Sequence, residues 1–443
     1  MQLPQVNPAA SRPEPTEVGS YFVANYPPFS VWRPDHVEAA RRALAASARP
    51  KTPLGLYLHI PFCRKRCKFC YFRVYTDKNA DQVEAYADAL AREVALYADC
   101  PALDGRQFEF VYFGGGTPSF LSNQQIERLI ERIRRHWHWD AAREVTFECE
   151  PGTLKESKLS TIRSIGVTRL SLGVEHFDDD VLELNGRAHH SPEIFRSYEW
   201  ARRVGFPQIN VDLIAGMVGD TDAKWTDTVK KAIRLAPDSV TIYQMELPHN
   251  AVFSREAKQR GVEPPVADWA TKRRWMAEAF AAFEADGYEI SSAYTLVRKD
   301  RRAGFVYRDS LWHGADMIGT GVASFSHFGG VHYQNHDQWD DYVGAVGRGE
   351  LPIARALSVS KDDLLTREWI LQLKTGAADT EYFKRKFGVD VRRRFGDALD
   401  GLAADGCLEG GNGSVRLTRE ALLRVDALLP RFFAKQYREI RYT

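Results

Sequence analysis

The sequence predicts an α/β protein, with a partial (β/α)6 barrel followed by a C-terminal winged-helix-like module. Six strand-like segments alternate with helical periodicity between residues 54 and 286, which is typical of parallel sheets. Polar motifs follow these strands at their carboxyl ends, where barrels carry active sites. After residue 358 the pattern changes to helices and a glycine-rich hairpin.

The chain has 443 residues, enough for two or three domains. We expect an N-terminal arm over 1–50, the barrel with an extension over 51–357, and the module over 358–443. The arm is rich in Pro, Ala and Ser and then aromatic, so we expect its aromatic residues to pack on the body.

The net charge and the hydropathy of the chain limit the classes of partner that we expect. Lys and Arg total 60 against 59 Asp and Glu, a net charge of +1, which gives no support for binding nucleic acid or an anionic membrane. No apolar run of membrane-spanning length is visible, and the first residues lack the apolar core of a secretory signal. We therefore expect a cytoplasmic protein with no nucleic-acid or membrane partner.

The elements follow in order. Strand 54–60 precedes a helix near 81–97, and strand 108–113 precedes a helix that Ser122 and Gln125 begin as a capping box. The remaining pairs are strand 145–150 with helix 155–165, strand 169–174 with helix 192–203, strand 209–216 with helix 222–235, and strand 240–245 with helix 268–286.

The C-terminal module is predicted from helices near 362–373 and 391–405, a hairpin over 408–418 and a last helix over 419–437. Its charges are mixed, which favours packing or covering the site over binding DNA.

Six cysteines divide into two groups. Cys63, Cys67 and Cys70 lie in a C-x3-C-x2-C pattern directly after the first strand. Three thiolates on one loop can each bind one iron of a [4Fe–4S] cubane, which leaves the fourth iron open to a chelating substrate. A zinc site with His59 as a further ligand, or unrelated thiols, are the alternatives. The scattered cysteines are expected to be small buried hydrophobes: Cys100, Cys149 and Cys407.

A glycine run follows the second strand. Gly114, Gly115 and Gly116 precede Thr117 and Pro118, and glycines let backbone groups approach a ligand closely. Alone this is a weak signal, but after the cysteine motif it indicates a ligand site next to a cluster.

These two motifs together resemble the radical S-adenosylmethionine (SAM) superfamily. More narrowly, YLHIPFC, VYFGGGTPS, RLSLGVEHFDDDVLELNGRAHH, NVDLIAGMVGDT and WHGADMIGTGVASFS resemble the oxygen-independent coproporphyrinogen III oxidase family. The resemblance spans about residues 54–335 and continues through the C-terminal module. That family comprises the oxidase, heme-chaperone relatives, anaerobic heme-degrading enzymes and class C radical SAM methyltransferases.

The resemblance implies a role for each matching position. The three clustered cysteines would hold a [4Fe–4S] cluster. The residues that would contact SAM are Tyr57, Gly114, Gly115, Gly116, Thr117, Glu148, Arg187, Asp212, Tyr243, Gln244 and Met245. Glu148 would lie near the SAM amine, Asp212 at the ribose hydroxyls and residues 243–245 along the adenine. Such groups complement an ammonium and a diol, although Glu148 or Asp212 alone could be a helix cap or a structural ion pair.

Several positions depart from the oxidase. Tyr71 and Phe72 replace its glycine and further cysteine, and Glu175 replaces a glutamine. Where the oxidase has a phenylalanine–glutamine pair for a second SAM, this chain has residues 305–307, with Phe325 at an isoleucine position. These departures cast doubt on coproporphyrinogen decarboxylation.

The favoured hypothesis is therefore a class C-type methyltransferase or cyclopropanase that uses two SAM molecules to alkylate an sp² carbon of a small-molecule substrate. Tyr307 and Phe325 would line the second SAM site, and Tyr307 and Glu175 are the catalytic candidates; ordinary core aromatics are the plain alternative for Tyr307 and Phe325. The implied electron donor is a flavodoxin or ferredoxin.

Two further hypotheses stay open. One is the anaerobic oxidative decarboxylation of coproporphyrinogen III. The other is a heme carrier, for which the candidate ligands are His313, His327, His332 and His336.

Overall fold

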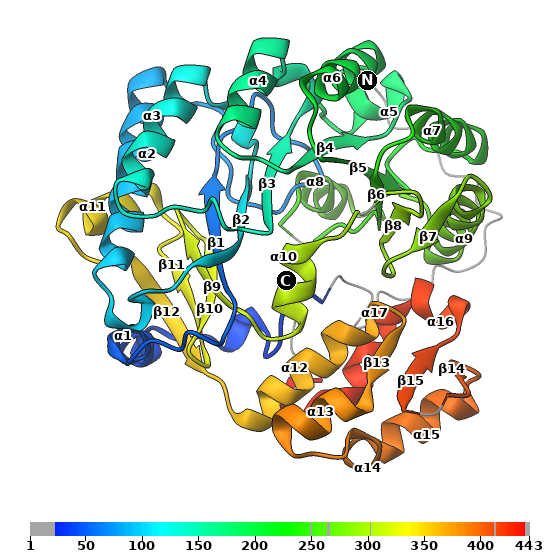
Figure 1. The fold of residues 1–443 in the computed structure, drawn as a ribbon. Coiled ribbons are helices and arrows are strands. Elements are labelled where there is room, and N and C mark those ends of the chain that lie inside the picture. The colour runs from blue at the N-terminus through cyan, green and yellow to red at the C-terminus, as the bar shows by residue number, and fades with distance from the viewer. Residues whose placement is uncertain (1–22, 249, 264–265, 302, 412, 439–443) are drawn as a thin grey trace.

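The computed structural model describes residues 23–438 other than 249, 264–265, 302 and 412. A mixed, open sheet of twelve strands in the order β12-β11-β10-β9-β1-β2-β3-β4-β5-β6-β8-β7 runs through the described part of the body. The sheet curves without closing into a barrel (Figure 1).

Six parallel strands form the centre of this sheet, as the sequence predicts. They are β1 (Leu54–Ile60), β2 (Phe108–Gly115), β3 (Glu144–Cys149), β4 (Arg169–Glu175), β5 (Gln208–Ala215) and β6 (Ser239–Gln244). Each pairs in parallel with the next. Because both faces of the strands are covered, nearly every residue along them is buried.

The crossover helices cover the outer face of the curved sheet (Figure 1). They are α2 (Ala80–Ala98), α3 (Asn123–Arg134), α4 (Glu156–Ser164), α6 (Ser191–Val204), α7 (Asp222–Leu235) and α9 (Trp269–Ala285), with the shorter α5 (Asp179–Leu184) between α4 and α6 in sequence. Helix α8 (Val252–Arg260) lies away from this outer layer and contacts the cysteine loop, since Phe253 N–H donates to the Lys68 carbonyl at 3.1 Å. Short 3₁₀ turns follow α2, β2 and β3: η3 (Pro101–Leu103), η4 (Pro118–Phe120) and η5 (Pro151–Thr153). The capping box of Ser122 and Gln125 begins α3 as predicted.

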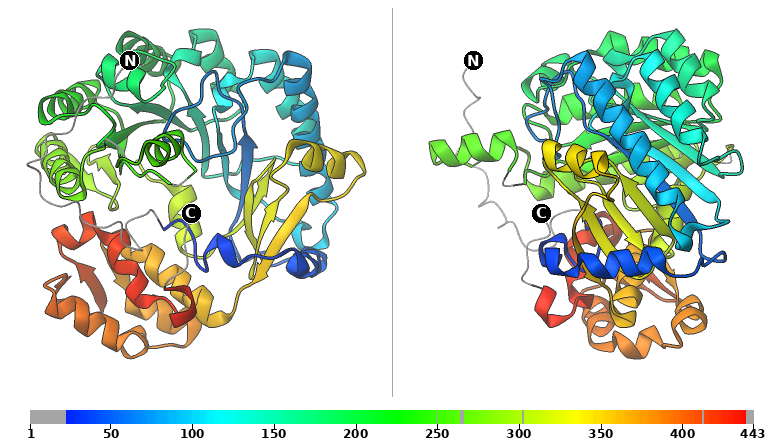
Figure 2. Two further views of the ribbon diagram at one scale, coloured as in Figure 1. Left: turned by 180° about the vertical axis from the view of Figure 1, so that it is seen from behind. Right: turned by 90° about the vertical axis from the view of Figure 1, so that its left-hand side faces the viewer.

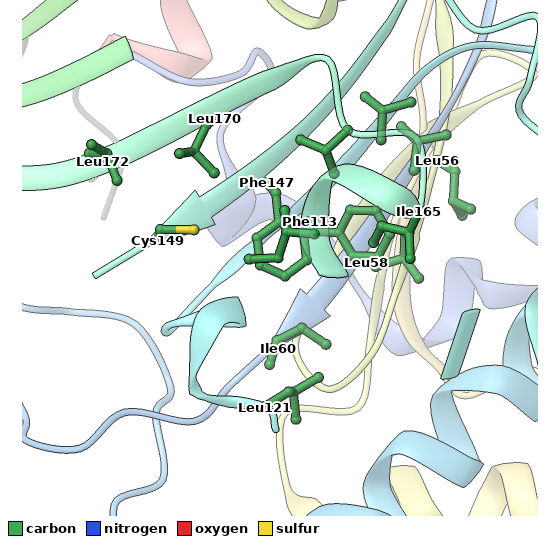
Figure 3. Close-up of a cluster of buried hydrophobic side chains, with 14 of the residues drawn as sticks. Leu56, Leu58, Ile60, Phe113, Leu121, Phe147, Cys149, Ile165, Leu170 and Leu172 are labelled. Carbon is green, nitrogen blue, oxygen red and sulfur yellow. The ribbon is translucent and has the colours of Figure 1, made fainter. Parts of the chain in front are cut away.

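The main hydrophobic core lies between the sheet and these helices. Figure 3 shows part of it, where side chains from β1 to β4 meet those of the loops and helices outside them. The labelled members are Leu56, Leu58, Ile60, Phe113, Leu121, Phe147, Cys149, Ile165, Leu170 and Leu172. Cys149 is buried here and Cys407 is buried in the C-terminal module, as expected for scattered cysteines, whereas Cys100 is only half-buried.

Residues 288–358 add six strands that the sequence analysis did not assign. The extension consists of β7 (Tyr288–Ile290), β8 (Thr295–Arg298), α10 (Val306–Trp312), β9 (Asp316–Thr320), β10 (Phe325–Phe328), β11 (Val331–Asn335), α11 (Trp339–Gly347) and β12 (Ile353–Ser358). Strand β9 pairs in parallel with β1, and the other pairings are antiparallel. The extension thereby widens the sheet on both sides of the six central strands.

The described part of the N-terminal arm packs on the body. It contains η1 (Phe29–Val31), η2 (Pro34–His36) and α1 (Val37–Ala45). Tyr26 and Trp32 are buried, as expected of the aromatic stretch, while Tyr21 and Phe22 lie outside the described residues.

The C-terminal module has its own core around Trp369. It consists of α12 (Lys361–Leu373), β13 (Ala377–Asp379), α13 (Thr380–Phe387), α14 (Val391–Arg394), α15 (Gly396–Ala404), β14 (Leu408–Glu409), β15 (Ser414–Leu417), α16 (Arg419–Leu423), α17 (Val425–Leu428), η6 (Leu429–Phe432) and η7 (Lys435–Tyr437). Helices with a small antiparallel sheet match the predicted class, with β13 as an additional strand.

Two predicted helices of the module are wrong in extent. The helix over 391–405 is interrupted at Phe395, whose φ of −113° and ψ of 23° leave the helical region before Gly396. The helix over 419–437 is divided into short turns, because Arg424 leaves helical geometry and Pro430 lacks an N–H to donate.

The module lies at the same end of the molecule as residues 23–45, which we call the N-terminal segment (Figure 2). Val23 N–H donates to Asp426 Oδ1 at 2.9 Å, and Gln244 Nε2 donates to the Leu423 carbonyl at 3.0 Å. The module therefore faces the carboxyl end of β6. Among the described helices, none is long and apolar enough to span a bilayer.

Candidate active site

One cavity of about 1290 Å³ opens at the carboxyl ends of the central strands. The candidate residues that line it are Tyr57, Cys63, Cys67, Cys70, Gly115, Gly116, Thr117, Glu148, Glu175, Arg187, Asp212, Tyr243, Gln244, Met245, Tyr307 and Phe325. Gly114 lies behind this wall, where a Cβ would come within 2.9 Å of the Tyr57 hydroxyl. The fold thus brings together residues that are far apart in sequence.

The three clustered cysteines lie on the loop that follows β1. The loop is held by backbone bonds from Cys63 N–H to the Tyr75 carbonyl at 3.1 Å and from Lys68 N–H to the Asn185 carbonyl at 3.0 Å. All three thiols are partly exposed and face the cavity.

Polar side chains from the segments that follow β2 and α5 reach two of these sulfurs. Thr117 Oγ1 donates to Cys63 Sγ at 3.4 Å, and Arg187 Nη1 donates to Cys67 Sγ at 3.3 Å. Gly116 leaves no room for a side chain, since a Cβ there would lie 3.0 Å from Cys63 Sγ and 2.9 Å from the Phe62 carbonyl oxygen. The glycine run therefore lets the backbone approach the cysteine loop, as predicted.

The donor set suits a cubane better than a single ion. Among the described residues, no three His, Cys, Asp or Glu side chains converge as the ligands of one ion would. In a cubane each thiolate binds a different iron, so the three thiols need not converge on one point. His59 lies against Gly115 instead of joining the cysteines. The zinc alternative therefore finds no support in the geometry.

Burial raises the pKa of Cys63 to about 11 and that of Cys70 to about 12. Both thiols are therefore protonated at neutral pH until a metal displaces their protons, so assembly of a cluster releases protons.

Three carboxylates gather opposite the cysteine loop. Glu148 accepts hydrogen bonds from Tyr112 at 2.7 Å and from Gly115 N–H at 3.2 Å. Asp212 accepts from Ser171 Oγ at 2.7 Å. Burial raises the pKa of Glu148 and of Glu175 to about 7, and repulsion from Asp212 adds to both shifts. Burial also raises the pKa of Asp212. A cation bound among these three carboxylates would offset their negative charge and favour their ionised forms. The carboxylate cluster therefore suits a cationic ligand.

Arg187 is the cation beside this group. Its Nη1 lies 3.6 Å from Glu175 Oε1, and its Nη2 donates to the Gly173 carbonyl at 2.6 Å. Glu175 itself has a positive φ of 64°, which is unusual for a residue with a side chain and marks a constrained position at the end of β4. Glu175 stands where the oxidase has a glutamine, so this position carries an additional ionisable group. Arg187 partly balances its negative charge.

Glu150 and His189 are site residues that the sequence analysis missed. Glu150 accepts from Arg64 Nη2 at 3.1 Å and lies 3.0 Å from His189 Nδ1. Burial alone would raise the pKa of Glu150, but the His189 hydrogen bond and the charges of Arg187 and Arg64 lower it to about 2. The pair fastens the cysteine loop to the segment that carries Arg187. Glu150 lies two residues after Glu148, and His189 lies two residues after Arg187, so their closeness to candidate residues was the available signal.

The residues at the end of β6 form another wall. Met245 N–H donates to the Ala215 carbonyl at 2.8 Å, which extends the β5–β6 pairing beyond the strand. Tyr243 is 39% exposed, although it lies along the cavity. This strand end is therefore open enough to border a planar ligand.

Tyr307 and Phe325 occupy separate places on the cavity wall. The Tyr307 ring lies 4.4 Å from that of Tyr112, next to Glu148. The Phe325 ring lies 4.2 Å from that of Phe29 in the N-terminal segment. Both side chains pack against aromatic residues and also border the cavity.

The four candidate heme-ligating histidines do not form one site. His327 Nδ1 lies 2.8 Å from His332 Nδ1, and His332 Nε2 lies 3.0 Å from the Tyr26 carbonyl oxygen. Of the four, His327 borders the cavity, while His313 is exposed on the surface.

Comparison with known proteins identifies the two parts of the chain. Residues 57–232 match the radical SAM superfamily, and residues 359–424 match the HemN C-terminal domain. The chain therefore carries a radical SAM domain and a HemN C-terminal domain. A [4Fe–4S] cluster and SAM are the cofactors that a radical SAM domain implies.

Two groups of curated relatives resemble this chain over most of its length. The oxygen-independent coproporphyrinogen III oxidase of Salmonella typhimurium is 28% identical over 417 residues, which cover 90% of each chain. The heme chaperone HemW of Bacillus subtilis is 28% identical over 373 residues, 83% of this chain and 96% of the chaperone.

A solved structure shows the same fold. Coproporphyrinogen III oxidase (HemN) from Escherichia coli superposes with a TM-score of 0.80 at 26% identity, covering 93% of this chain and 96% of that one. The predicted radical SAM fold with a C-terminal module is confirmed. The relatives favour the oxidase or chaperone hypothesis over the methyltransferase hypothesis.

Proposed function

We propose that Cys63, Cys67 and Cys70 hold the [4Fe–4S] cluster and that the carboxylate group beside them binds SAM. When bound, the reduced cluster and SAM supply a 5′-deoxyadenosyl radical that removes a hydrogen atom from an unactivated C–H bond. Glu148 would receive the SAM ammonium group, Arg187 its carboxylate and Asp212 its ribose hydroxyls. The raised pKa values of Glu148 and Asp212 support a cationic occupant.

The reaction that we propose is the oxidative decarboxylation of a propionate-type side chain on a large ring substrate, with coproporphyrinogen III as the first candidate. The observation that carries the proposal is the similarity to coproporphyrinogen III oxidases over 90% of both chains. The cavity of about 1290 Å³ supports it, since it extends past the SAM site to Tyr307 and Phe325.

The proposed decarboxylation is balanced in atoms and electrons. A propionate side chain would lose a hydrogen atom from its ring-attached carbon to the deoxyadenosyl group. The C–C bond to the carboxylate then breaks, releasing carbon dioxide and leaving a vinyl group, and one electron passes to a one-electron acceptor. The chain's own task is to hold the side chain beside SAM and to keep water away.

A second candidate is alkyl transfer with a second SAM. Tyr307 and Phe325 favour it, because they replace the residues that bind a second SAM in the oxidase resemblance and yet still border the cavity. In this case S-adenosylhomocysteine would form beside 5′-deoxyadenosine.

One anaerobic experiment separates these candidates. The reconstituted protein is incubated with SAM, a low-potential reductant and coproporphyrinogen III, and nucleosides, carbon dioxide and porphyrin products are quantified. Deoxyadenosine with carbon dioxide supports decarboxylation, and S-adenosylhomocysteine with deoxyadenosine supports alkyl transfer. Tight heme binding without SAM cleavage would contradict both and favour a heme carrier, which the similarity to HemW supports. A Cys67→Ala variant serves as the inactive control.

A further inference from the structure

Two arginines border the cavity from segments outside the six central strands. Arg355 lies on β12, and Arg367 lies on α12 of the C-terminal module. Arg367 Nε donates to Asn25 Oδ1 at 2.8 Å, and Arg355 Nη1 donates to the Phe29 carbonyl at 3.0 Å. The N-terminal segment therefore orients both guanidinium groups. We call Arg355 and Arg367 the arginine pair.

The arginine pair has only neutral partners. The remaining printed bonds run from Arg355 Nε to Gln334 Oε1 at 2.6 Å and from Arg367 Nη1 to the Leu311 carbonyl at 3.1 Å. In the described part of the chain, no carboxylate lies within ion-pair distance of either arginine. The nearby lysines, Lys374 and Lys386, do form ion pairs with carboxylates. The pair thus adds two positive charges to this wall without a carboxylate in direct contact, although Glu368 acts on Arg367 and Asp337 on Arg355 from a greater distance.

Acidic groups near the pair are already engaged. Asp426 lies 2.8 Å from Lys374 Nζ, and Glu368 lies 2.7 Å from Lys386 Nζ. Asp337, at the cavity rim, lies 3.7 Å from Arg73. His327 and His332 share one short contact between ring nitrogens, and burial lowers the pKa of both, so they add no charge at neutral pH.

A buried cation without a counter-charge is costly. Arg367 is only 4% exposed, and burial lowers its pKa to about 10. Nearby, Arg308 borders the same cavity with its Nη1 buried and without a hydrogen-bond partner in the structure. An anion in the cavity would remove this cost, and a carboxylate matches the planar guanidinium donors.

We propose that Arg355 and Arg367 form a carboxylate anchor that selects an acidic substrate and holds it by a carboxylate other than the one that reacts. This deepens and rests on the proposed function, because the anchored molecule is the one whose C–H bond is attacked. The aromatic rings of Phe29 and Phe325 border the same wall and suit a substrate with a flat, apolar ring next to its acidic group.

The test uses coproporphyrin III and its tetramethyl ester as probes, which differ in the charge of their side chains. Binding to the reconstituted holoenzyme with SAM is followed by fluorescence titration. We expect the acid to bind the wild-type protein roughly tenfold or more tightly than the ester, as expected of a charge-assisted hydrogen bond. The Arg355→Met/Arg367→Met variant should lose this preference, and the corresponding double lysine variant should keep part of it.

An Arg348→Met variant is the matched control, since Arg348 is exposed and pairs with Glu350 at 2.8 Å outside the cavity. The number of SAM molecules bound and the deoxyadenosine formed without substrate are measured in every variant. An unchanged preference in the double methionine variant would overturn the anchor. If the double methionine variant binds one SAM fewer and still prefers the acid to the ester, the arginines bind a second SAM. This outcome would likewise overturn the substrate assignment. Absence of deoxyadenosine from the wild-type protein would contradict the proposed function, while the binding preference would still report on the anchor.

Discussion

The hydroxyl group of Tyr112 donates a hydrogen bond of 2.7 Å to Oε1 of Glu148. Gly115 N–H donates to the other carboxylate oxygen. Both bonds stabilise the ionised form, yet burial and the neighbouring Asp212 and Glu175 charges hold the pKa of Glu148 at about 7. This carboxyl group therefore changes its charge within the physiological pH range.

The affinity for SAM should rise with pH. Glu148 is mostly protonated at pH 6 and mostly ionised at pH 8, so binding should be tighter at pH 8, by up to about tenfold. Anaerobic calorimetry at several pH values measures this. Glu148→Gln should bind SAM weakly and with little pH dependence, whereas Glu156→Gln, an exposed helix residue, should behave like the wild type. A pH-independent affinity in the wild type would contradict the assignment.

The cluster should depend on Cys67 and not on Cys100. Cys67→Ala removes one of the three clustered thiols, so iron content and cluster absorbance should be lost together with SAM cleavage. Cys100→Ala alters a half-buried cysteine between α2 and η3 and should retain the cluster. Iron analysis and absorbance spectra of the two reconstituted variants provide the comparison. Full SAM cleavage by the Cys67 variant would refute the proposed cluster ligands.

Glu150 should stabilise the fold at neutral pH. Its folded-state pKa of about 2 lies below the ordinary value of 4.5, so the stabilisation is present above pH 4.5 and is lost as the pH falls from about 4.5 to 2. We expect Glu150→Gln to lower the free energy of unfolding at pH 7 by about 3 kcal/mol, the equivalent of this shift. Urea unfolding of the metal-free protein at pH 7 and pH 4 measures it. The difference between the variant and the wild type should shrink at pH 4, and a difference that grows would show the opposite linkage.

The contact between Lys374 and Asp426 should be costly to break. The Lys374 side chain is fully buried, so Asp426→Asn would remove the carboxylate 2.8 Å from its ammonium group and destabilise the protein by about 3 kcal/mol. Thermal unfolding and protease cleavage of the N-terminal segment report the effect. Asp405→Asn breaks the exposed pair with Arg431 and should cost no more than about 1 kcal/mol. Equal effects of the two variants would argue against this role of Asp426.

The central strands and the cysteine loop were predictable because their signals are local. A buried parallel strand such as β1 is a continuous apolar run, and Cys63, Cys67 and Cys70 are close in sequence. The arginine pair was not predictable, since Arg355 and Arg367 reach the cavity through tertiary packing against the N-terminal segment. The short strands of the extension pair with distant partners, as β9 does with β1, and leave little local pattern.

The bond between Val23 and Asp426 joins residues separated by 403 positions. During synthesis, the ribosome must release nearly the whole chain before this bond can form. Until then, the part of the cavity wall that Asp426 and its neighbours contribute is missing. This side of the cavity is therefore completed only late in synthesis, after the loop that carries Cys63, Cys67 and Cys70 has been made.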